Sequence, residues 1–246
     1  MLDALAVVAP VTCAGCGGPD RGLCALCGSA LVGGVERRVT PGGLTVSSAL
    51  RYEGTVRSVV LAFKEQGRTD VATPLARTLL SSVLDAARAG AHGAGGSTVE
   101  LVSPPPGKGS RRRRGYDPVP LLLAKAGLPR PASVMRRAWS GSVQKSLDRE
   151  QRARNARGAL LATSALHGRR FVLVDDVLTS GSTLDSLAEA ITAAGGSVVA
   201  GATLAFTPLH SAERSLGMTG GVSGRGLRAG DGGTSLGERG AEDRLV

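Results

Sequence analysis

Two adjacent carboxylates, Asp175 and Asp176, come directly after a continuous apolar run, residues 171–174 (FVLV). Such a run is typical of a strand that is covered on both faces of a sheet. Carboxylates at the end of a buried strand are costly unless a ligand or a partner uses them. In a parallel sheet, ligands bind just beyond this end of the strands. We therefore take the two acids as candidate site residues.

The loop that follows, residues 179–183 (TSGST), leads into a predicted helix. Backbone amides and the helix dipole make such a helix start an anion site, and four hydroxyls around one glycine suit a phosphate monoester. A phosphate beside two acids would be repelled, so the ligand has to place a neutral group between them. A ribose 5′-phosphate does this, because its hydroxyls can donate to the acids. The expected phosphate contacts are Thr179, Ser180, Gly181, Ser182 and Thr183.

Other readings of this stretch fit less well. A P-loop needs a lysine before its Ser or Thr, and none follows Gly181. A dinucleotide fingerprint needs three spaced glycines, with its acid after them. A receiver-type acid pair would bind magnesium, but no phosphate loop would follow it. Two solvated acids beside a Ser/Thr helix cap remain the plainest alternative.

The chain's four cysteines form the pattern Cx2C-x7-Cx2C near the N-terminus. Two CxxC pairs can offer four thiolates to one tetrahedral ion, which predicts a structural zinc site in a small hairpin. A disulfide scaffold would need an oxidising compartment, and a redox motif would use a single pair beside a βαβ unit. The expected zinc ligands are Cys13, Cys16, Cys24 and Cys27.

The net charge of +10 is concentrated in one region of the chain. Residues 101–170 hold sixteen Lys and Arg against three acids, so the rest sums to −3. This distribution predicts an anionic partner, either nucleic acid or a phosphorylated small molecule. Aromatic residues make up only 2% of the chain, which weakens the case for single-stranded DNA.

No apolar run approaches the ~18–20 residues of a membrane helix. The apolar N-terminus carries Asp3 and no basic segment, which is unlike a signal peptide. We therefore expect a cytoplasmic protein without membrane insertion, with a short amphipathic helix at its start.

The hydrophobic pattern predicts the elements that position these residues. Strands are expected at 44–52, 99–103, 171–176 and 197–206, and helices at 54–67, from Asp70 to 87, at 118–126 and at 183–194. The fold class is α/β, with a parallel-sheet core flanked by helices and a small N-terminal zinc hairpin. Residues 140–158 read as a long mobile loop. The predicted organisation is a zinc module at 1–35, a core domain at 44–206 and a disordered Gly-rich tail at 207–246.

The acid-loop motif resembles the PRPP-binding motif of type I phosphoribosyltransferases. Four segments, YEGTVRSVVLAFKEQGR, LVSPPPGKGSRRRRGYDPVPLLLAKAG, SVQKSLDREQRARNARGAL and VLVDDVLTSGSTLDSLAEAITAAGGSVV, are similar in order to those of the ComF family. The cysteine module is also similar, and the likeness covers most of residues 10–206. It implies a phosphoribosyltransferase fold, binding of PRPP with Mg²⁺ and an association with competence for DNA uptake.

The resemblance also implies roles for further residues. Asp175 and Asp176 would orient the ribose and stabilise positive charge at C1′. A diphosphate loop would comprise Ser103, Pro104, Pro105, Lys108 and Arg114, although prolines offer no amides to an anion. A flexible lid over PRPP would use Gln144, Lys145, Arg149, Arg152 and Asn155. Tyr116 and Asp117 replace the Phe and Asn of the family's RGFN pattern, which keeps a helix cap.

No stretch of the sequence reads as a pocket for the acceptor of the phosphoribosyl group. Three hypotheses therefore stay open. The first is a Mg-dependent phosphoribosyltransferase with an unknown acceptor. The second is a domain that senses PRPP or a nucleoside monophosphate without turnover. The third is an accessory of DNA uptake that contacts single-stranded DNA or a helicase.

Overall fold

The computed structural model describes residues 11–19, 21–91, 98–107, 115–137 and 160–208. The predicted N-terminal helix, the residues Lys108 and Arg114, the five lid residues and the Gly-rich tail after residue 208 lie outside these ranges. Thr207, the first residue of the predicted tail, is described, and its amide donates to the Leu178 carbonyl. The helices are α2 (Ala25–Ser29), α3 (Gly54–Glu65), η1 (Thr69–Val71), α4 (Ala72–Ala91), α6 (Pro118–Lys125) and α8 (Ser182–Ala193). The strands are β1 (Glu36–Val39), β2 (Thr45–Arg51), β3 (Val99–Val102), β4 (Met135–Arg137), β5 (Leu160–Ala162), β6 (Arg170–Leu178) and β7 (Ser197–Phe206).

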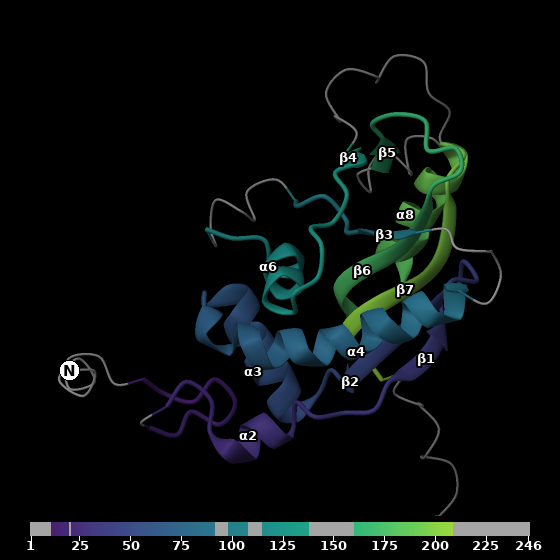
Figure 1. Cartoon of the computed structure of the whole chain (residues 1–246). Helices are drawn as coiled ribbons and strands as arrows, with labels where there is room; N and C mark the ends of the chain where they lie inside the picture. Colours follow the sequence, from purple (N-terminus) through teal and green to yellow (C-terminus); the bar gives the residue numbers. More distant parts are fainter. Residues whose placement is uncertain (1–10, 20, 92–97, 108–114, 138–159, 209–246) are drawn as a thin grey trace, which may run out of the picture. The chain divides into compact units, whose positions relative to one another are not determined.

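The main sheet of the described chain has the strand order β1-β2-β7-β6-β3 (Figure 1). Strands β2, β7, β6 and β3 are parallel to their neighbours, and only the edge strand β1 is antiparallel. The parallel strands therefore bring their carboxyl ends to one edge of the sheet. The loop after β3 and the loop after β6 leave from this same edge. The predicted α/β class with a mostly parallel sheet is confirmed.

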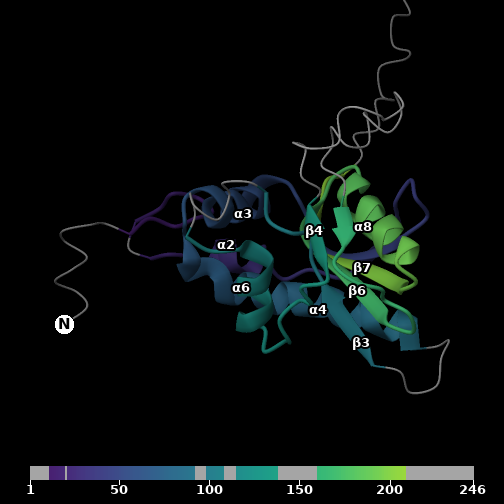
Figure 2. The ribbon, with the colours of Figure 1, turned by 90° about the horizontal axis from the view of Figure 1, so that it is seen from above.

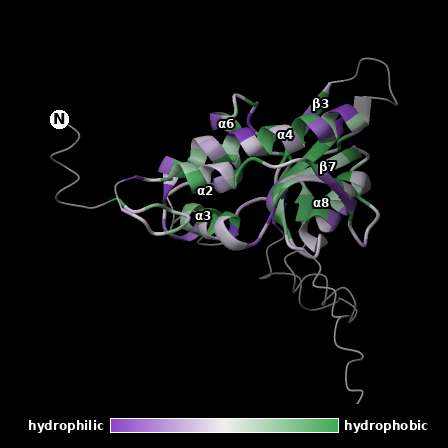
Figure 3. Ribbon diagram, turned by 90° about the horizontal axis from the view of Figure 1, so that it is seen from below, coloured by the Kyte–Doolittle hydropathy of each residue, from purple (hydrophilic) through white to green (hydrophobic). Residues whose placement is uncertain are grey.

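Helices cover both faces of this sheet. Helices α3, α4 and α6 pack on one face, and α8 packs on the other together with the β4–β5 hairpin (Figure 2). The apolar run of β6 explains this, because alternate side chains of a strand point to opposite faces. Val172 and Val174 enter the core beneath α4, while Phe171 and Leu173 enter the core beneath α8. The strands beside α4 and α8 are coloured largely as hydrophobic in Figure 3, as expected of a sheet that is buried on both faces.

Several predicted boundaries are revised by the structure. Strand β6 was predicted to end at Asp176 but continues to Leu178, because residues as far as Leu178 still pair with β7. The two acids therefore lie two residues further from the end of the strand than predicted. Asp70 lies within η1 and its carboxylate accepts hydrogen bonds from Arg68, so it is not a simple helix cap. Asp117 is the N-cap residue of α6, but its side chain makes no capping hydrogen bond.

Three strands were absent from the sequence prediction. Strand β1 is polar and exposed along most of its length, which gives no alternating apolar signal. Strands β4 and β5 have three residues each and pair antiparallel with one another. They flank residues 138–159, which contain the predicted lid and lie outside the described ranges. Within the described ranges, no helix is both long and apolar enough to cross a lipid bilayer.

Candidate functional site

The four cysteine sulfurs of the N-terminal hairpin converge on one point. All four Sγ atoms lie within 4.8 Å of one another, and those of Cys16 and Cys24 are 3.9 Å apart. Four ligands at the Zn–S distance of ~2.3 Å would place sulfurs ~3.8 Å apart in a tetrahedron. The hairpin leaves no room beside this cluster, since a Cβ at Gly15 would lie 2.6 Å from the Cys27 sulfur. The clustering predicted from the CxxC spacing is confirmed.

The ionisation of these thiols shows what a metal would supply. Burial and the neighbouring thiols raise the pKa of Cys27 to about 12. Burial also disfavours the Cys13 thiolate, but backbone hydrogen bonds outweigh it and lower the pKa of that thiol to about 6. A cluster of this kind holds four thiolates only if a cation balances their charge. The donor set of four sulfurs fits Zn²⁺, with no position left open for catalysis.

An arginine connects the zinc hairpin to the core domain. The guanidinium of Arg68 donates to the carbonyl oxygens of Thr12 and Gly22, at 2.9 and 3.2 Å. It also pairs with Asp70, at 2.8 Å. On the other side of the hairpin, the buried Leu31 carbonyl accepts a hydrogen bond from Thr78 of α4, at 2.7 Å. The predicted zinc module therefore packs on the core through α4 and η1.

The two acids of β6 point to opposite faces of the sheet, as neighbouring residues of a strand must. Asp175 lies on the side of α8 and lines a small cavity of about 20 Å³. Of the residues expected to bind phosphate, Thr179, Gly181 and Thr183 line the same cavity. The structure therefore brings the first acid of the pair together with the phosphate loop.

The ionisation of Asp175 is disfavoured in the folded protein. Burial is the largest cause, and the charge of Asp176 adds to it, so that the pKa of Asp175 rises to about 7. A backbone hydrogen bond from Asp176 and the charge of Lys64 act in the opposite direction, while Asp117 contributes a further small increase. A carboxyl group poised near neutrality in a cavity is a recognised mark of a functional site.

Asp176 has a different partner on the other face of the sheet. Its carboxylate forms an ion pair with Lys64 of α3, with the Nζ and Oδ2 atoms 2.8 Å apart. Both side chains are mostly shielded from solvent. Lys64 was not among the residues predicted from sequence. It occupies the last turn of an amphipathic helix, where a lysine is ordinarily explained by the helix dipole.

The phosphate loop owes its shape to Gly181, the N-cap residue of α8. Its φ of 81° lies in the left-handed region, which a residue with a side chain rarely adopts. The Ser180 and Ser182 hydroxyls are exposed and lie 3.0 Å apart. Gly181 has no side chain to cap the amides of α8, and the Ser182 amide makes only a long hydrogen bond of 3.4 Å to the Ser180 hydroxyl. This arrangement is the one that an anion-binding helix start requires.

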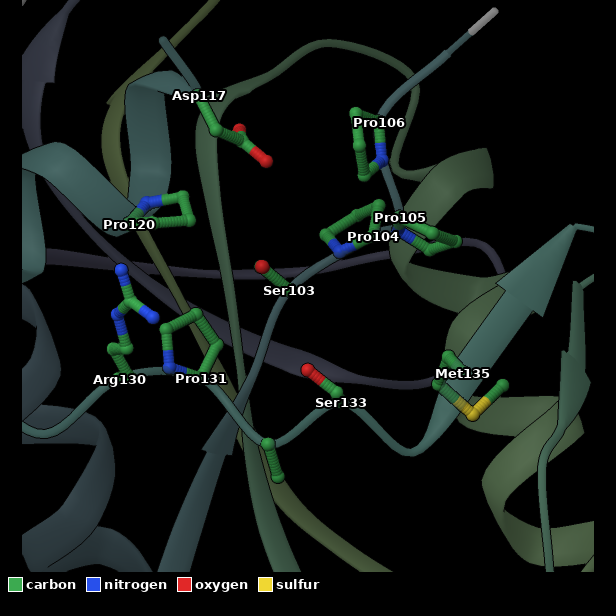
Figure 4. Close-up of a pocket in the computed structure, with 11 residues that line it drawn as sticks. Ser103, Pro104, Pro105, Pro106, Asp117, Pro120, Arg130, Pro131, Ser133 and Met135 are labelled. Atoms are coloured by element: carbon green, nitrogen blue, oxygen red, sulfur yellow. The ribbon is translucent and has the colours of Figure 1, made fainter. Parts of the chain in front are cut away.

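The segment after β3 forms one wall of a larger pocket, of about 270 Å³. The register pairs Val102 with Leu173 of β6, so Ser103 lies level with Val174, one residue before the acid pair. Figure 4 shows Ser103 near the centre of this pocket, with Asp117 and Arg130 on its borders. The remaining lining residues are Pro104, Pro105, Pro106, Pro120, Pro131, Ala132, Ser133 and Met135.

The residues around this pocket were predicted only in part. Ser103, Pro104 and Pro105 come from the predicted diphosphate loop, whereas Arg130 and Ser133 were not identified. The segment that carries them has no periodicity, and it is held by a hydrogen bond of 2.7 Å from the Ala132 amide to the Leu101 carbonyl. A contact of this kind at a sheet edge leaves no signature in the sequence.

Comparison with known proteins agrees with this geometry. Residues 113–217 match the family described as the phosphoribosyl transferase domain. This matched region includes the acid-loop motif, and the mostly parallel sheet with flanking helices agrees with a phosphoribosyltransferase-type fold. Over 139 residues the chain is 31% identical to Competence protein F of Haemophilus influenzae. The matched stretch covers 53% of this chain and 59% of that protein. The predicted resemblance is confirmed: the chain is ComF-like, with a phosphoribosyltransferase-type domain.

Proposed function

We propose that this protein binds PRPP together with Mg²⁺ and transfers its phosphoribosyl group to an acceptor with release of diphosphate. The observation that carries the proposal is the placement of Asp175 in one cavity with the loop of residues 179–183. Loop amides and hydroxyls would hold the 5′-phosphate, and the acid would accept hydrogen bonds from the ribose. In the reaction the C1′–O bond to diphosphate breaks and a bond from C1′ to the acceptor forms. The acceptor gives up one proton.

The remaining charged groups have consistent roles. Asp176 would support positive charge that develops at C1′, and its ion pair with Lys64 would hold that carboxylate in place. Mg²⁺ prefers carboxylate and phosphate oxygens and keeps several waters, so Asp175 and the diphosphate are its fitting ligands. Bound there, the ion would neutralise the leaving diphosphate. The predicted lid residues would add cations and exclude water.

The proline-lined pocket is our proposed place for the acceptor. Its prolines give rigid apolar walls without amide donors, so polar recognition is left to Ser103, Ser133, Asp117 and Arg130. Among the described residues that line it, Asp117 and Arg130 carry opposite charges. A small neutral ring or an amine would fit these lining residues, beside the predicted diphosphate loop.

A second function, as an accessory of DNA uptake, draws on a separate observation. Leu26 and Val32 of the zinc hairpin are 80% and 84% exposed, although both are large apolar side chains. In this second proposal these two side chains would contact another macromolecule. The basic residues 101–170 would add attraction for an anionic partner such as single-stranded DNA. PRPP could then regulate these contacts without turnover.

Calorimetric titration of Mg²⁺-PRPP into the zinc-loaded full chain tests the proposed function. Wild type should bind saturably. The Asp175→Asn/Asp176→Asn variant should lose at least ~1.5 kcal/mol of binding free energy, because it loses charged hydrogen bonds to the ribose. A matched control is Glu100→Gln, which removes a carboxylate from β3, where it pairs with Arg169 near the opposite edge of the sheet. This variant should bind like wild type.

Each outcome separates the hypotheses. Binding that the double variant loses and the control keeps would support the PRPP site. Acceptors could then be screened by diphosphate release. A correctly folded wild type that gives no binding heat would overturn the proposal and leave the DNA-uptake function in the lead.

A further inference from the structure

The turn between β1 and β2, residues 40–44, reaches the first turn of α8 although about 140 residues separate the two in sequence. The Asp185 carboxylate accepts two hydrogen bonds from this turn. One comes from the Thr40 hydroxyl to Oδ1, and the other from the Gly42 amide to Oδ2, at 3.0 Å. The Thr40 oxygen also accepts a hydrogen bond from the Leu44 amide, at 3.1 Å. Asp185 therefore holds the turn through both of its carboxylate oxygens.

Two glycines allow this close contact. A Cβ on Gly42 would lie 2.6 Å from the Asp185 carboxyl carbon, so only glycine lets the carboxylate approach. A Cβ on Gly181 would lie 2.7 Å from the Thr40 methyl group. The turn therefore touches the N-cap of α8 directly, and Thr40 is 94% buried there, with a relative exposure of 6%.

These contacts form a closed circuit around the phosphate loop. Thr40 packs on Gly181, the Gly181 carbonyl accepts the Asp185 amide at 2.9 Å, and the Asp185 side chain returns to Thr40. Each member limits the movement of the other two. Gly181 alone would be conformationally free, because glycine pays the highest entropy cost for adopting one backbone conformation. The circuit supplies the restraint that the glycine lacks.

We propose that Asp185 is a positioning residue of the phosphate loop, which it fixes in its binding shape by holding the β1–β2 turn against Gly181. The inference rests on the proposed function, since it concerns the loop that would receive the 5′-phosphate. A carboxylate near an anion site repels the bound anion. Both oxygens of Asp185 accept hydrogen bonds from the turn, and these hydrogen bonds reduce the repulsion. Misplacement of a binding loop by about 1 Å can cost up to roughly 100-fold in function.

Two substitutions break the circuit at different points. Asp185→Ala removes both acceptors, and Thr40→Val keeps the shape and the methyl contact but removes the hydroxyl. Each should weaken the binding of Mg²⁺-PRPP about tenfold in calorimetry. Thr40→Ser keeps the hydroxyl and should bind within about twofold of wild type. Asp185→Asn keeps one oxygen that can accept the Thr40 hydrogen bond but removes the charge. Its affinity for Mg²⁺-PRPP should lie between those of wild type and Asp185→Ala, and it replaces Asp185→Ala in the test if that variant does not fold.

The alternative role of Asp185 is a favourable charge near the helix start. Thr40→Val separates the two roles, because it leaves that charge in place. Glu189→Ala is the matched control, since it removes an exposed acid one turn further along α8. This control should leave PRPP binding unchanged.

Hydrogen exchange of the amides of residues 180–185 gives a readout that needs no ligand. Exchange there should accelerate several-fold in Asp185→Ala and Thr40→Val but not in Glu189→Ala, with the last turn of α8 unaffected. Exchange and PRPP binding at wild-type levels in a folded Asp185→Ala variant would overturn the inference. If wild type does not bind PRPP, the proposed function fails, and hydrogen exchange still decides whether Asp185 positions the loop.

Discussion

At the scale of single residues, folding opposes the ionisation of the Asp175 carboxyl group. Its pKa rises from 3.8 to about 7, chiefly through burial and then through the charge of Asp176. The folded protein therefore keeps a proton that the unfolded chain releases between these two values. Stability contributed by this proton is present at low pH and is lost as the pH rises through about 7. An acid at this position lowers the stability of the folded protein above neutral pH, and such a cost is common at ligand-binding sites.

The substitution Asp175→Asn should therefore stabilise the protein in a pH-dependent way. We expect the free energy of unfolding to increase by about 2 kcal/mol at pH ~8 and to change little at pH ~4. Urea denaturation of both proteins at these two pH values measures the difference. Glu100→Gln is the control, because partner Arg169 lowers the pKa of that acid. An equal effect of Asp175→Asn at both pH values would rule out ionisation as the cause.

At the scale of elements, close packing between β2, β7 and α8 sets the position of the phosphate loop. Gly201 lies in the middle of β7 opposite Val46 of β2. A Cβ on Gly201 would lie 2.9 Å from a methyl carbon of Val46 and 3.5 Å from Leu184 of α8. A glycine inside a strand usually weakens it, but here it makes room for the Val46 side chain of the neighbouring strand, while Leu184 of α8 lies at ordinary contact distance.

Gly201→Ala should destabilise the protein by about 1–3 kcal/mol through overpacking. Val46→Ala alone should also destabilise, since Val46 is fully buried. The double variant should be destabilised by less than the sum of the two single variants, because Ala at position 46 frees the space that the new methyl group at position 201 needs. Thermal or urea unfolding of the four proteins tests this. Strict additivity would show that the two residues do not compete for the same space.

At the scale of the whole described molecule, the zinc hairpin and the core domain support one another. Arg68 ties the hairpin to η1, and the hairpin also contacts α3, where Thr55 lies close to Gly15. Helix α3 in turn supplies Lys64 to Asp176. The cysteine cluster is therefore linked through α3 to one of the two site acids.

Removal of zinc should lower the Tm of the full chain by about 5–10 °C, because the binding free energy of a structural ion is folding free energy. The comparison is a melting curve with and without a strong zinc chelator, with metal content measured in parallel. Cys27→Ser should give the lower Tm without chelator, whereas Ser29→Ala on the exposed end of α2 should not. A Tm indifferent to zinc would show that the hairpin needs no metal.

Much of this protein could be predicted from local patterns. The CxxC spacing placed four sulfurs together because a short hairpin leaves its cysteines few other arrangements. The apolar run of β6, its acids and the following Ser/Thr loop indicated a strand, a ligand edge and a helix start, since all three are adjacent in the chain. Proline and glycine gave the limits of α6 correctly, as Pro118 begins it and Gly127 follows its end with a φ of 72°. These features depend on interactions within short segments of the chain.

Only the tertiary structure decided which distant groups meet at the site. Lys64 reaches Asp176, the β1–β2 turn reaches Asp185, and Ser133 and Arg130 join the loop after β3. Each of these contacts joins two segments that are distant in the sequence. The order of the strands in the sheet brings the two segments together. A lysine in a last helical turn or a threonine in a polar turn has an ordinary local explanation. The sequence by itself determined the chemistry of the loop and the cysteines, and packing across the sheet decided what positions them.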